Sequence, residues 1–249
     1  MDLDRITHPL RLARGSHQPG SGKGCAMNVI SYIYGDRVVT DYPACSARPL
    51  AAFVQSCNDL LAGPSGYLSP EDSLVALELG WQTVGTSGTE PSVIHAWVAE
   101  LLTNPTWGVV QYAKLSSTKA IYDIAELHRL AARSQQPTQS DWENAYSAAV
   151  AESRSYDGAG HPAGTHALRS AYESTALADD HHQGTVDAVT GSALRAHAFA
   201  TGSAASARFA AITHDAIASW RQLASVRSAG GASSTLTSDR AHELVSTTP

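Results

Sequence analysis

The sequence predicts a mostly α-helical protein, and three features favour this class. Apolar residues recur at helical spacing in several segments, helix-start signals precede some of them, and the second half of the chain is rich in Ala, which packs helices closely. The strongest amphipathic segment is 119–133, where one helical face carries Ile121, Ile124, Leu127 and Leu130. With 249 residues, the chain can form one large domain or two smaller ones.

The amino-terminal part is expected to begin without regular structure. Residues 1–14 are mixed and polar and predict a flexible terminus. Residues 15–24 hold four glycines and a proline, which predict a loop that can approach a ligand closely. A helix is favoured at residues 25–34, because the apolar side chains share one face and Gly35 suits the position after a helix end. A short β-hairpin through the same residues is the open alternative.

Start signals place the helices that follow. They are expected to begin at Pro49, Pro70, Pro91, Lys119 and, after a capping box at Ser140–Glu143, Ala145. Ser69 precedes one of the prolines as an N-cap residue, so that start is the clearest. Residues 108–113 fit either a short strand or the start of a helix.

The pattern also predicts a division of the chain. Residues 15–153 are expected to form a helical domain, and the segment from Tyr156 to Gly164 has the composition of a linker. Residues 165–227, rich in Ala, Ser and His, predict a helical hairpin or bundle packed through small side chains, with the histidines exposed. Residues 228–249 have the composition of a disordered tail.

Composition and sequence pattern argue against a nucleic-acid-binding, membrane-spanning or secreted protein. The net charge of −6 gives no general attraction to nucleic acid, so nucleic-acid binding is not expected. No apolar run reaches the roughly 18 residues that a membrane span needs, and no secretory signal is recognisable. The three cysteines are an odd number, which favours free or metal-bound thiols over a disulfide framework. We therefore expect a cytoplasmic protein.

The candidate chemistry lies between residues 15 and 45. Cys25 is expected at a helix N-terminus, where unsatisfied N–H groups and the helix dipole lower a thiol pKa and favour the thiolate. His17 is close enough in sequence to act as a base, and Asp41 could orient it. These three residues form the candidate catalytic set of a thiol nucleophile, with a small buried cysteine as the alternative.

A metal site is the second interpretation of the same segment. His17, Cys25 and Cys45 are ligand types that suit zinc, with Cys57 or Asp41 as a fourth ligand. Their spacing matches no standard zinc signature, and the sequence has no Cys-x-x-Cys motif. Zinc therefore stays an open cofactor prediction.

The glycine-rich loop also indicates anion binding. Gly22, Lys23 and Gly24 precede the expected helix start, and helix N-termini bind phosphate groups through their N–H groups. The loop is no Walker A motif, because Gly24 stands where that motif requires Ser or Thr.

Several of these residues also carry a resemblance. The series His17, Gly22-Lys-Gly-Cys25-Ala-Met27, Asp41, Pro43 and Cys45 resembles hypothetical proteins of actinobacteria and their bacteriophages, in which a His, a Gly-rich loop, Cys-x-Met and Asp-x-Pro-x-Cys recur near the amino terminus. The resemblance covers roughly residues 15 to 102 and implies an origin, not an activity. Cys57 lies outside the shared pattern.

Two functions are therefore expected from the sequence. The first is a cytoplasmic accessory or interaction protein with a structural, zinc-bound or metal-free His/Cys cluster, which binds a protein partner or forms a homodimer. The alternative is a thiol-dependent enzyme that uses Cys25 on a small or nucleotide-like substrate. The first is favoured because the sequence shows no complete catalytic set.

Overall fold

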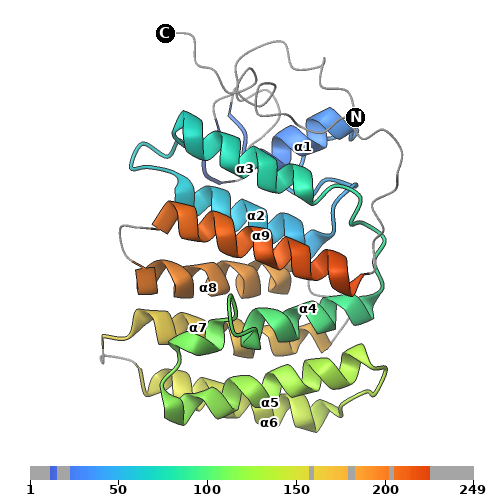
Figure 1. Ribbon diagram of the computed structural model, residues 1–249. Helices are drawn as coiled ribbons and strands as arrows, with labels where there is room; N and C mark the ends of the chain where they lie inside the picture. Colours follow the sequence, from blue (N-terminus) through green and yellow to red (C-terminus); the bar gives the residue numbers. More distant parts are fainter. Residues whose placement is uncertain (1–11, 16–22, 157–159, 179–182, 202–204, 225–249) are drawn as a thin grey trace. The chain divides into compact units, whose positions relative to one another are not determined.

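A computed structural model (Figure 1) describes residues 12–15, 23–156, 160–178, 183–201 and 205–224. In these residues every regular element is a helix, and strand-like pairing is limited to isolated bridges such as Leu12 with Gly24. The predicted mostly-α class is therefore confirmed. The predicted flexible terminus at 1–14 lies largely outside the described residues, and the predicted tail at 228–249 lies wholly outside them. The chain divides into two compact units between Gly88 and Thr89.

The described residues of the first unit form three helices: α1 (Ala26–Tyr34), α2 (Arg48–Leu61) and α3 (Pro70–Gln82). The helix predicted at 25–34 is confirmed and the hairpin alternative is wrong. Gly35 ends α1 with a φ of 92°, a conformation that suits glycine, and its N–H bonds back to the carbonyls of Ser31 and Tyr32. Ser69 caps α3 as predicted, because its hydroxyl accepts the N–H of Asp72.

The core of the first unit includes the apolar face of α2, whose residues recur at helical spacing. Five of these side chains are buried: Leu50, Phe53, Val54, Cys57 and Leu61. Helix α3 packs on α1 at Gly80, where an added Cβ would lie 3.1 Å from Ile30 and 3.4 Å from Met27. A glycine at this point lets the two helices approach closely and fixes the position of α1, which carries Cys25 at its start.

The second unit contains the remaining elements: α4 (Pro91–Thr103), η2 (Val109–Tyr112), α5 (Leu115–Ala132), α6 (Gln139–Arg154), α7 (Pro162–Ser174), η3 (Thr175–Ala178), α8 (Gln183–Thr201) and α9 (Ala205–Leu223). Two starts differ from the sequence pattern. Helix α5 begins four residues before the predicted Lys119, and the capping box of α6 uses Thr138 and Asp141 in place of Ser140 and Glu143. The ambiguous segment 108–113 contains a 3₁₀ turn.

The Gly/Pro segment that suggested a linker lies inside the second unit. Helix α6 packs on α7 across this segment, and the Tyr156 hydroxyl accepts the main-chain N–H of Lys114. The division at residue 88 therefore differs from the one that composition predicts near residue 160. Glycine and proline are common both between packed helices of one unit and in linkers between domains, so composition alone does not distinguish the two.

Tryptophan side chains form the centre of the second unit. Trp97 and Trp220 are fully buried and meet edge to face, with ring centroids 5.7 Å apart, and Trp97 Nε1 donates to the carbonyl of Ala216 at 2.8 Å. Trp107 lies 6.3 Å from Trp97. These contacts join α4 to α9 and to the turn before η2, as expected for aromatic core anchors.

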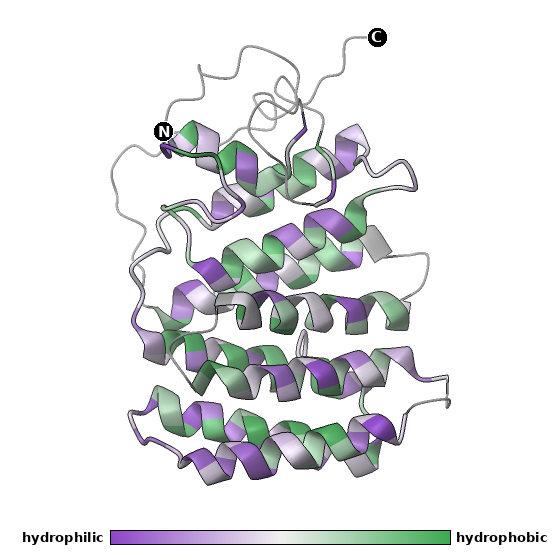
Figure 2. Cartoon of the chain, turned by 180° about the vertical axis from the view of Figure 1, so that it is seen from behind, coloured by the Kyte–Doolittle hydropathy of each residue, from purple (hydrophilic) through white to green (hydrophobic). Residues whose placement is uncertain are grey.

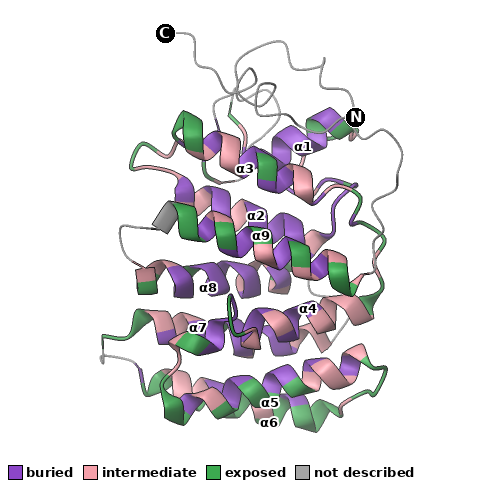
Figure 3. Ribbon diagram, in the orientation of Figure 1, coloured by how far each residue is buried: buried purple, intermediate pink, exposed green. Residues whose placement is uncertain are grey.

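Small side chains join α7 to α8. Ala167, Ala171 and Ala193 are buried, and the Ser170 hydroxyl donates to the main-chain carbonyl of Val189 at 3.0 Å. A side chain as short as serine reaches a neighbouring backbone only where two helices approach closely. Figure 3 shows α8 buried along most of its length, whereas α6 presents much exposed surface. Figure 2 shows that hydrophilic and hydrophobic residues are mixed along the helices.

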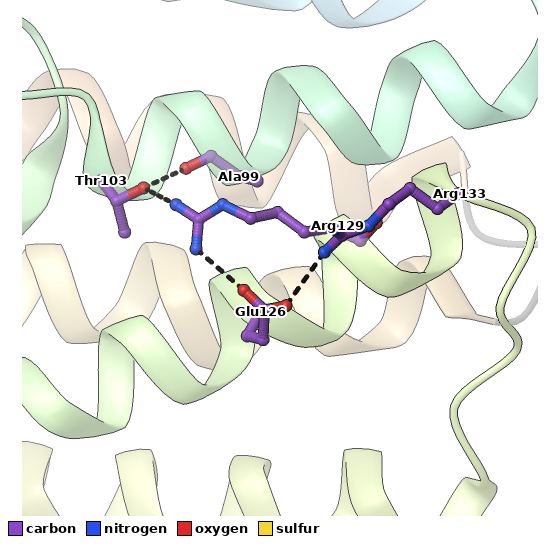
Figure 4. A network of polar contacts seen from close by, with 5 residues as sticks. All are labelled: Ala99, Thr103, Glu126, Arg129 and Arg133. Carbon is purple, nitrogen blue, oxygen red and sulfur yellow. Dashed lines mark hydrogen bonds and ion pairs between the residues drawn. The ribbon is translucent and has the colours of Figure 1, made fainter.

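A polar network lies at the junction of α4 and α5 (Figure 4). Arg129 donates to the Thr103 hydroxyl, which itself donates to the carbonyl of Ala99 at 2.8 Å. Glu126 accepts from both Arg129 and Arg133. These ion pairs are largely exposed, so we expect each to contribute less than about 1 kcal/mol to stability.

Candidate functional site

Cys25 is the N-cap residue of α1. The carbonyl oxygen of the Asn28 side chain accepts the main-chain N–H of Cys25 at 3.0 Å, in the arrangement of a capping box. The next N–H, from Ala26, is taken by the side-chain oxygen of Asn58 at 3.2 Å. Main-chain N–H groups of Asn28 and Met27 face the cysteine sulfur. The main-chain N–H groups of Cys25 and Ala26 are thus already hydrogen-bonded to protein side chains.

Asp41 completes this buried cluster. The thiol of Cys25 donates to Asp41 Oδ1 at 3.3 Å, and Asn28 Nδ2 donates to the same oxygen at 2.9 Å. Cys25 is 0% exposed, and Asp41 and Asn28 are also buried. The sequence placed Asp41 near Cys25 as the partner of a histidine base. The structure brings Asp41 to the sulfur directly, while His17 lies outside the described residues.

The electrostatics of this cluster favour a neutral thiol. Burial is the main cause that raises the pKa of Cys25, and the negative charge of Asp41 raises it further. The N–H groups of Asn28 and Met27 lower it, as expected at a helix N-terminus, but they do not outweigh the other two causes. The pKa of Cys25 therefore lies far above its ordinary value, so the sulfur is protonated at neutral pH.

A second asparagine ties the cluster to the segment at residues 12–15. Asn58 is fully buried, and its Nδ2 donates to the carbonyl of Ala13 at 3.0 Å while its oxygen holds the start of α1. Beside it, Asp59 accepts the N–H of Gly15 at 2.8 Å. Three parts of the first unit are thus joined through polar groups in its interior.

Cys45 lies in a different environment from Cys25. Its sulfur lies 3.7 Å from the Ser46 hydroxyl, which lies 2.7 Å from the hydroxyl of Thr83. Burial raises the pKa of Cys45, an effect that the Ser46 hydroxyl opposes. Both cysteines are free thiols. In the described part of the chain, no three His, Cys, Asp or Glu side chains are grouped as metal ligands, so zinc binding through His17, Cys25 and Cys45 stays a prediction.

The predicted anion-binding loop is described only in part. Gly22 lies outside the described residues, and the exposed Lys23 places its Nζ 5.4 Å above the ring of Tyr67. The carbonyl of Gly24 accepts the N–H of Ala13 at 3.0 Å. Since asparagine side chains already bind the N–H groups of Cys25 and Ala26, an anion would have to displace them from the start of α1.

The second unit contains buried histidines that the sequence pattern did not single out. His128 is fully buried, and its Nε2 lies 3.0 Å from the hydroxyl of Ser174, which donates to the carbonyl of Ala171. The serine oxygen therefore accepts from Nε2, and Nδ1 of His128 accepts from Nδ1 of His95 at 2.9 Å. Burial lowers the pKa of His128 well below its ordinary value, and His95 adds to this effect.

His197 corrects the prediction that the histidines of the second half are exposed. It is 0% exposed on α8, and its Nδ1 lies 2.7 Å from the hydroxyl of Tyr112. Burial lowers its pKa to about 4; the main chain of Trp107 acts in the opposite direction, and the charge of Arg208 lowers the pKa further. No local spacing signals this environment, because the partners come from elements some 85 residues away in sequence.

No family model, curated protein or solved structure matches the chain. The resemblance to actinobacterial and phage proteins therefore stays a prediction. No helix in the described residues is both long enough and apolar enough to cross a membrane.

Proposed function

We propose that this chain is an accessory protein that works by binding a protein partner or a second copy of itself, and that the Cys25 cluster is a structural element of its first unit. One observation carries the proposal. The Cys25 side chain is fully buried, and its thiol hydrogen is directed at the Asp41 carboxylate.

This geometry fits a structural role better than catalysis. A nucleophilic cysteine reacts as the thiolate and needs an approach for its substrate. Here burial and Asp41 both raise the pKa of Cys25, and its surface is covered by neighbouring protein atoms. Buried polar groups that satisfy one another hold a single arrangement of the chain, because breaking one contact leaves the others unpaired.

Exposed apolar residues of the same unit support the binding role. Tyr34, at the end of α1, is 48% exposed, and Val38, in the loop that follows, is 66% exposed. Tyr32 on the same helix is partly exposed. Such a group within seven residues of sequence is a candidate contact surface for a protein partner, since large apolar side chains gain free energy when a partner removes them from water.

Thiol labelling combined with unfolding tests this proposal. Iodoacetamide is applied to the folded protein and, in parallel, to the protein in denaturant, and the alkylated cysteines are identified by mass spectrometry. We expect Cys25 to react only after unfolding. We also expect Cys25→Ala to destabilise the first unit by about 1–3 kcal/mol, because Asp41 loses a buried donor. Cys25→Ser keeps a donor at this position and serves as the matched control.

A catalytic thiol gives the opposite result. Cys25 would then be labelled selectively in the folded protein near neutral pH, and Cys25→Ala would be as stable as the unchanged chain. That outcome would support the alternative, a thiol-dependent enzyme acting on a small or nucleotide-like substrate.

A further inference from the structure

The second unit contains a pocket that is separate from the Cys25 cluster. Its volume is about 200 Å³, and it lies where the turn after η2, the end of α6 and the start of α7 meet the last turns of α8. Its lining residues are Tyr112, Lys114, Tyr156, Gly160, His161, Pro162, Ala163, Gly164 and Phe199. This is below the usual range for drug-sized ligands, so its occupant is small.

Basic groups flank an aromatic ring in this pocket. Nζ of Lys114 lies 4.4 Å from the centre of the Tyr156 ring, and the His161 ring lies edge-on to Tyr156 with centroids 6.2 Å apart. Among the described residues, neither Lys114 nor His161 forms an ion pair with a carboxylate. An exposed ammonium group that forms no ion pair with a described carboxylate can bind an anionic ligand.

The start of α7 adds donors to the same pocket. Pro162 is the first residue of this helix and has no N–H, and Ala163 and Gly164 follow it in the lining. Their N–H groups belong to the first turn, which has no partners within the helix and carries a partial positive charge. Lys114 and the first turn of α7 thus place positive charge on one cavity from two separate elements.

The aromatic wall of the pocket is held rigidly. A Cβ at Gly164 would overlap Tyr156 Cε1 and lie 2.9 Å from its Cδ1, so the Tyr156 ring rests directly on the backbone of α7. The Tyr156 hydroxyl accepts the N–H of Lys114, which fixes the other end of the ring. At the rim, Phe199 is 55% exposed and stacks on His166 with an interplanar angle of 7°. Fixed rings bind a flat ligand without loss of side-chain freedom.

A third basic residue lies near the lining. The Tyr112 hydroxyl is bonded to His197 and lies 3.4 Å from Nη2 of Arg208, which is exposed on α9. The Tyr112 oxygen has two lone pairs, so it accepts from Arg208 whichever of Tyr112 and His197 donates in the hydrogen bond between them. The side of the pocket formed by Tyr112 is therefore also positively charged.

We propose that this pocket binds a small anion that carries a phosphate or carboxylate group on a flat apolar ring. Lys114 and the N–H groups at the start of α7 bind the anionic group, and Tyr156 and Phe199 contact the ring. The proposal concerns the second unit only and does not depend on the role of Cys25.

Titration of the full chain with three probes tests the proposal. Phenyl phosphate carries both recognised features, inorganic phosphate carries only the charge, and phenol carries only the ring. Isothermal titration calorimetry, together with the NMR shifts of the Gly160 and Gly164 amides, measures binding. We expect phenyl phosphate to bind at least about tenfold more tightly than either of the other probes and to shift both amides. Equal affinity for inorganic phosphate would overturn the assignment of the ring, and no binding of phenyl phosphate at millimolar concentration would overturn the whole proposal.

A pair of lysine variants locates the site. Lys114→Met keeps a long apolar side chain on the Tyr156 ring and removes the charge, so we expect it to weaken phenyl phosphate binding by about tenfold or more. Lys119→Met is the matched control, because Lys119 is exposed on α5, the helix that Lys114 precedes, and pairs with Asp123 at 2.6 Å without being part of the pocket lining. Circular dichroism confirms that both variants are folded. Unchanged affinity in Lys114→Met, or an equal loss in Lys119→Met, would contradict the assigned site.

Discussion

Acidification is expected to destabilise the second unit through its buried histidines. Burial lowers the pKa of His197 from 6.5 to about 4, so the folded protein keeps this ring neutral while the unfolded chain takes up a proton. The stability that the neutral His197 ring contributes is fully present at pH values above the pKa of this residue in the unfolded chain. It is lost as the pH falls below that pKa. For these two pKa values, the free energy of unfolding falls by about 2 kcal/mol between roughly pH 7.5 and pH 5. His128 acts in the same direction, because burial lowers its pKa as well.

Urea unfolding at the two pH values, followed by tryptophan fluorescence, measures this loss. Most of the tryptophans report on the second unit: Trp97, Trp107, Trp142 and Trp220. His197→Asn keeps a polar group near the Tyr112 hydroxyl and removes the titrating ring, so its stability should depend on pH less strongly, by about 2 kcal/mol over the same interval. The absolute stability of the variant does not enter this comparison.

Leu194→Ala is the control for general destabilisation. Leu194 is fully buried on the same helix, so this change weakens packing without removing a titrating group, and the pH dependence should stay that of the unchanged chain. Above about pH 4.5 the comparison also avoids the titration of Asp141, whose pKa is lowered by the hydroxyl and N–H of Thr138. If His197→Asn loses as much stability as the unchanged chain between the two pH values, the assignment to His197 is wrong.

Two further predictions concern the packing and capping of the second unit. Gly164→Ala should destabilise this unit by about 1–3 kcal/mol in urea unfolding. The added methyl group would overlap the Tyr156 ring and lie 3.0 Å from the carbonyl oxygen of Tyr112. Gly184→Ala is the matched control, because nothing lies within 4 Å of a methyl group added there. Thr138→Ala should lower the free energy of unfolding by about 1 kcal/mol, because the Thr138 hydroxyl accepts the N–H of Asp141 at the start of α6. Ser140→Ala should leave it nearly unchanged, because Ser140 is not the N-cap residue.

The helices were predictable because their signals are local. The spacing of Phe53, Cys57 and Leu61 indicates one apolar face, and all three side chains are buried on it. The start of α6 shows where such signals become ambiguous. Thr138 to Asp141 and Ser140 to Glu143 both fit a capping box, and the structure uses the first. The sequence alone does not distinguish two overlapping candidates of this kind.

Part of the candidate site was predictable from the sequence, but its chemistry was not. Cys25 does begin a helix, and Asp41 does lie beside it. The sequence pattern favoured a thiolate because a helix N-terminus lowers the pKa of a thiol. Burial and the Asp41 charge act in the opposite direction and prevail. Both depend on which residues surround the sulfur, and the Asp41 carboxylate reaches it from sixteen residues later in the chain.

The same reasoning explains why the pocket of the second unit is the better place to look for a small ligand. Two helix N-termini were candidates for anion binding, at α1 and at α7. At α1, the side chains of Asn28 and Asn58 already accept the first N–H groups, and the nearby Asp41 carboxylate repels an anion. At α7, the residues of the first turn line a cavity whose lining also includes Lys114. The two ends share the same helix dipole, so the side chains around them decide which one is open to a negatively charged ligand.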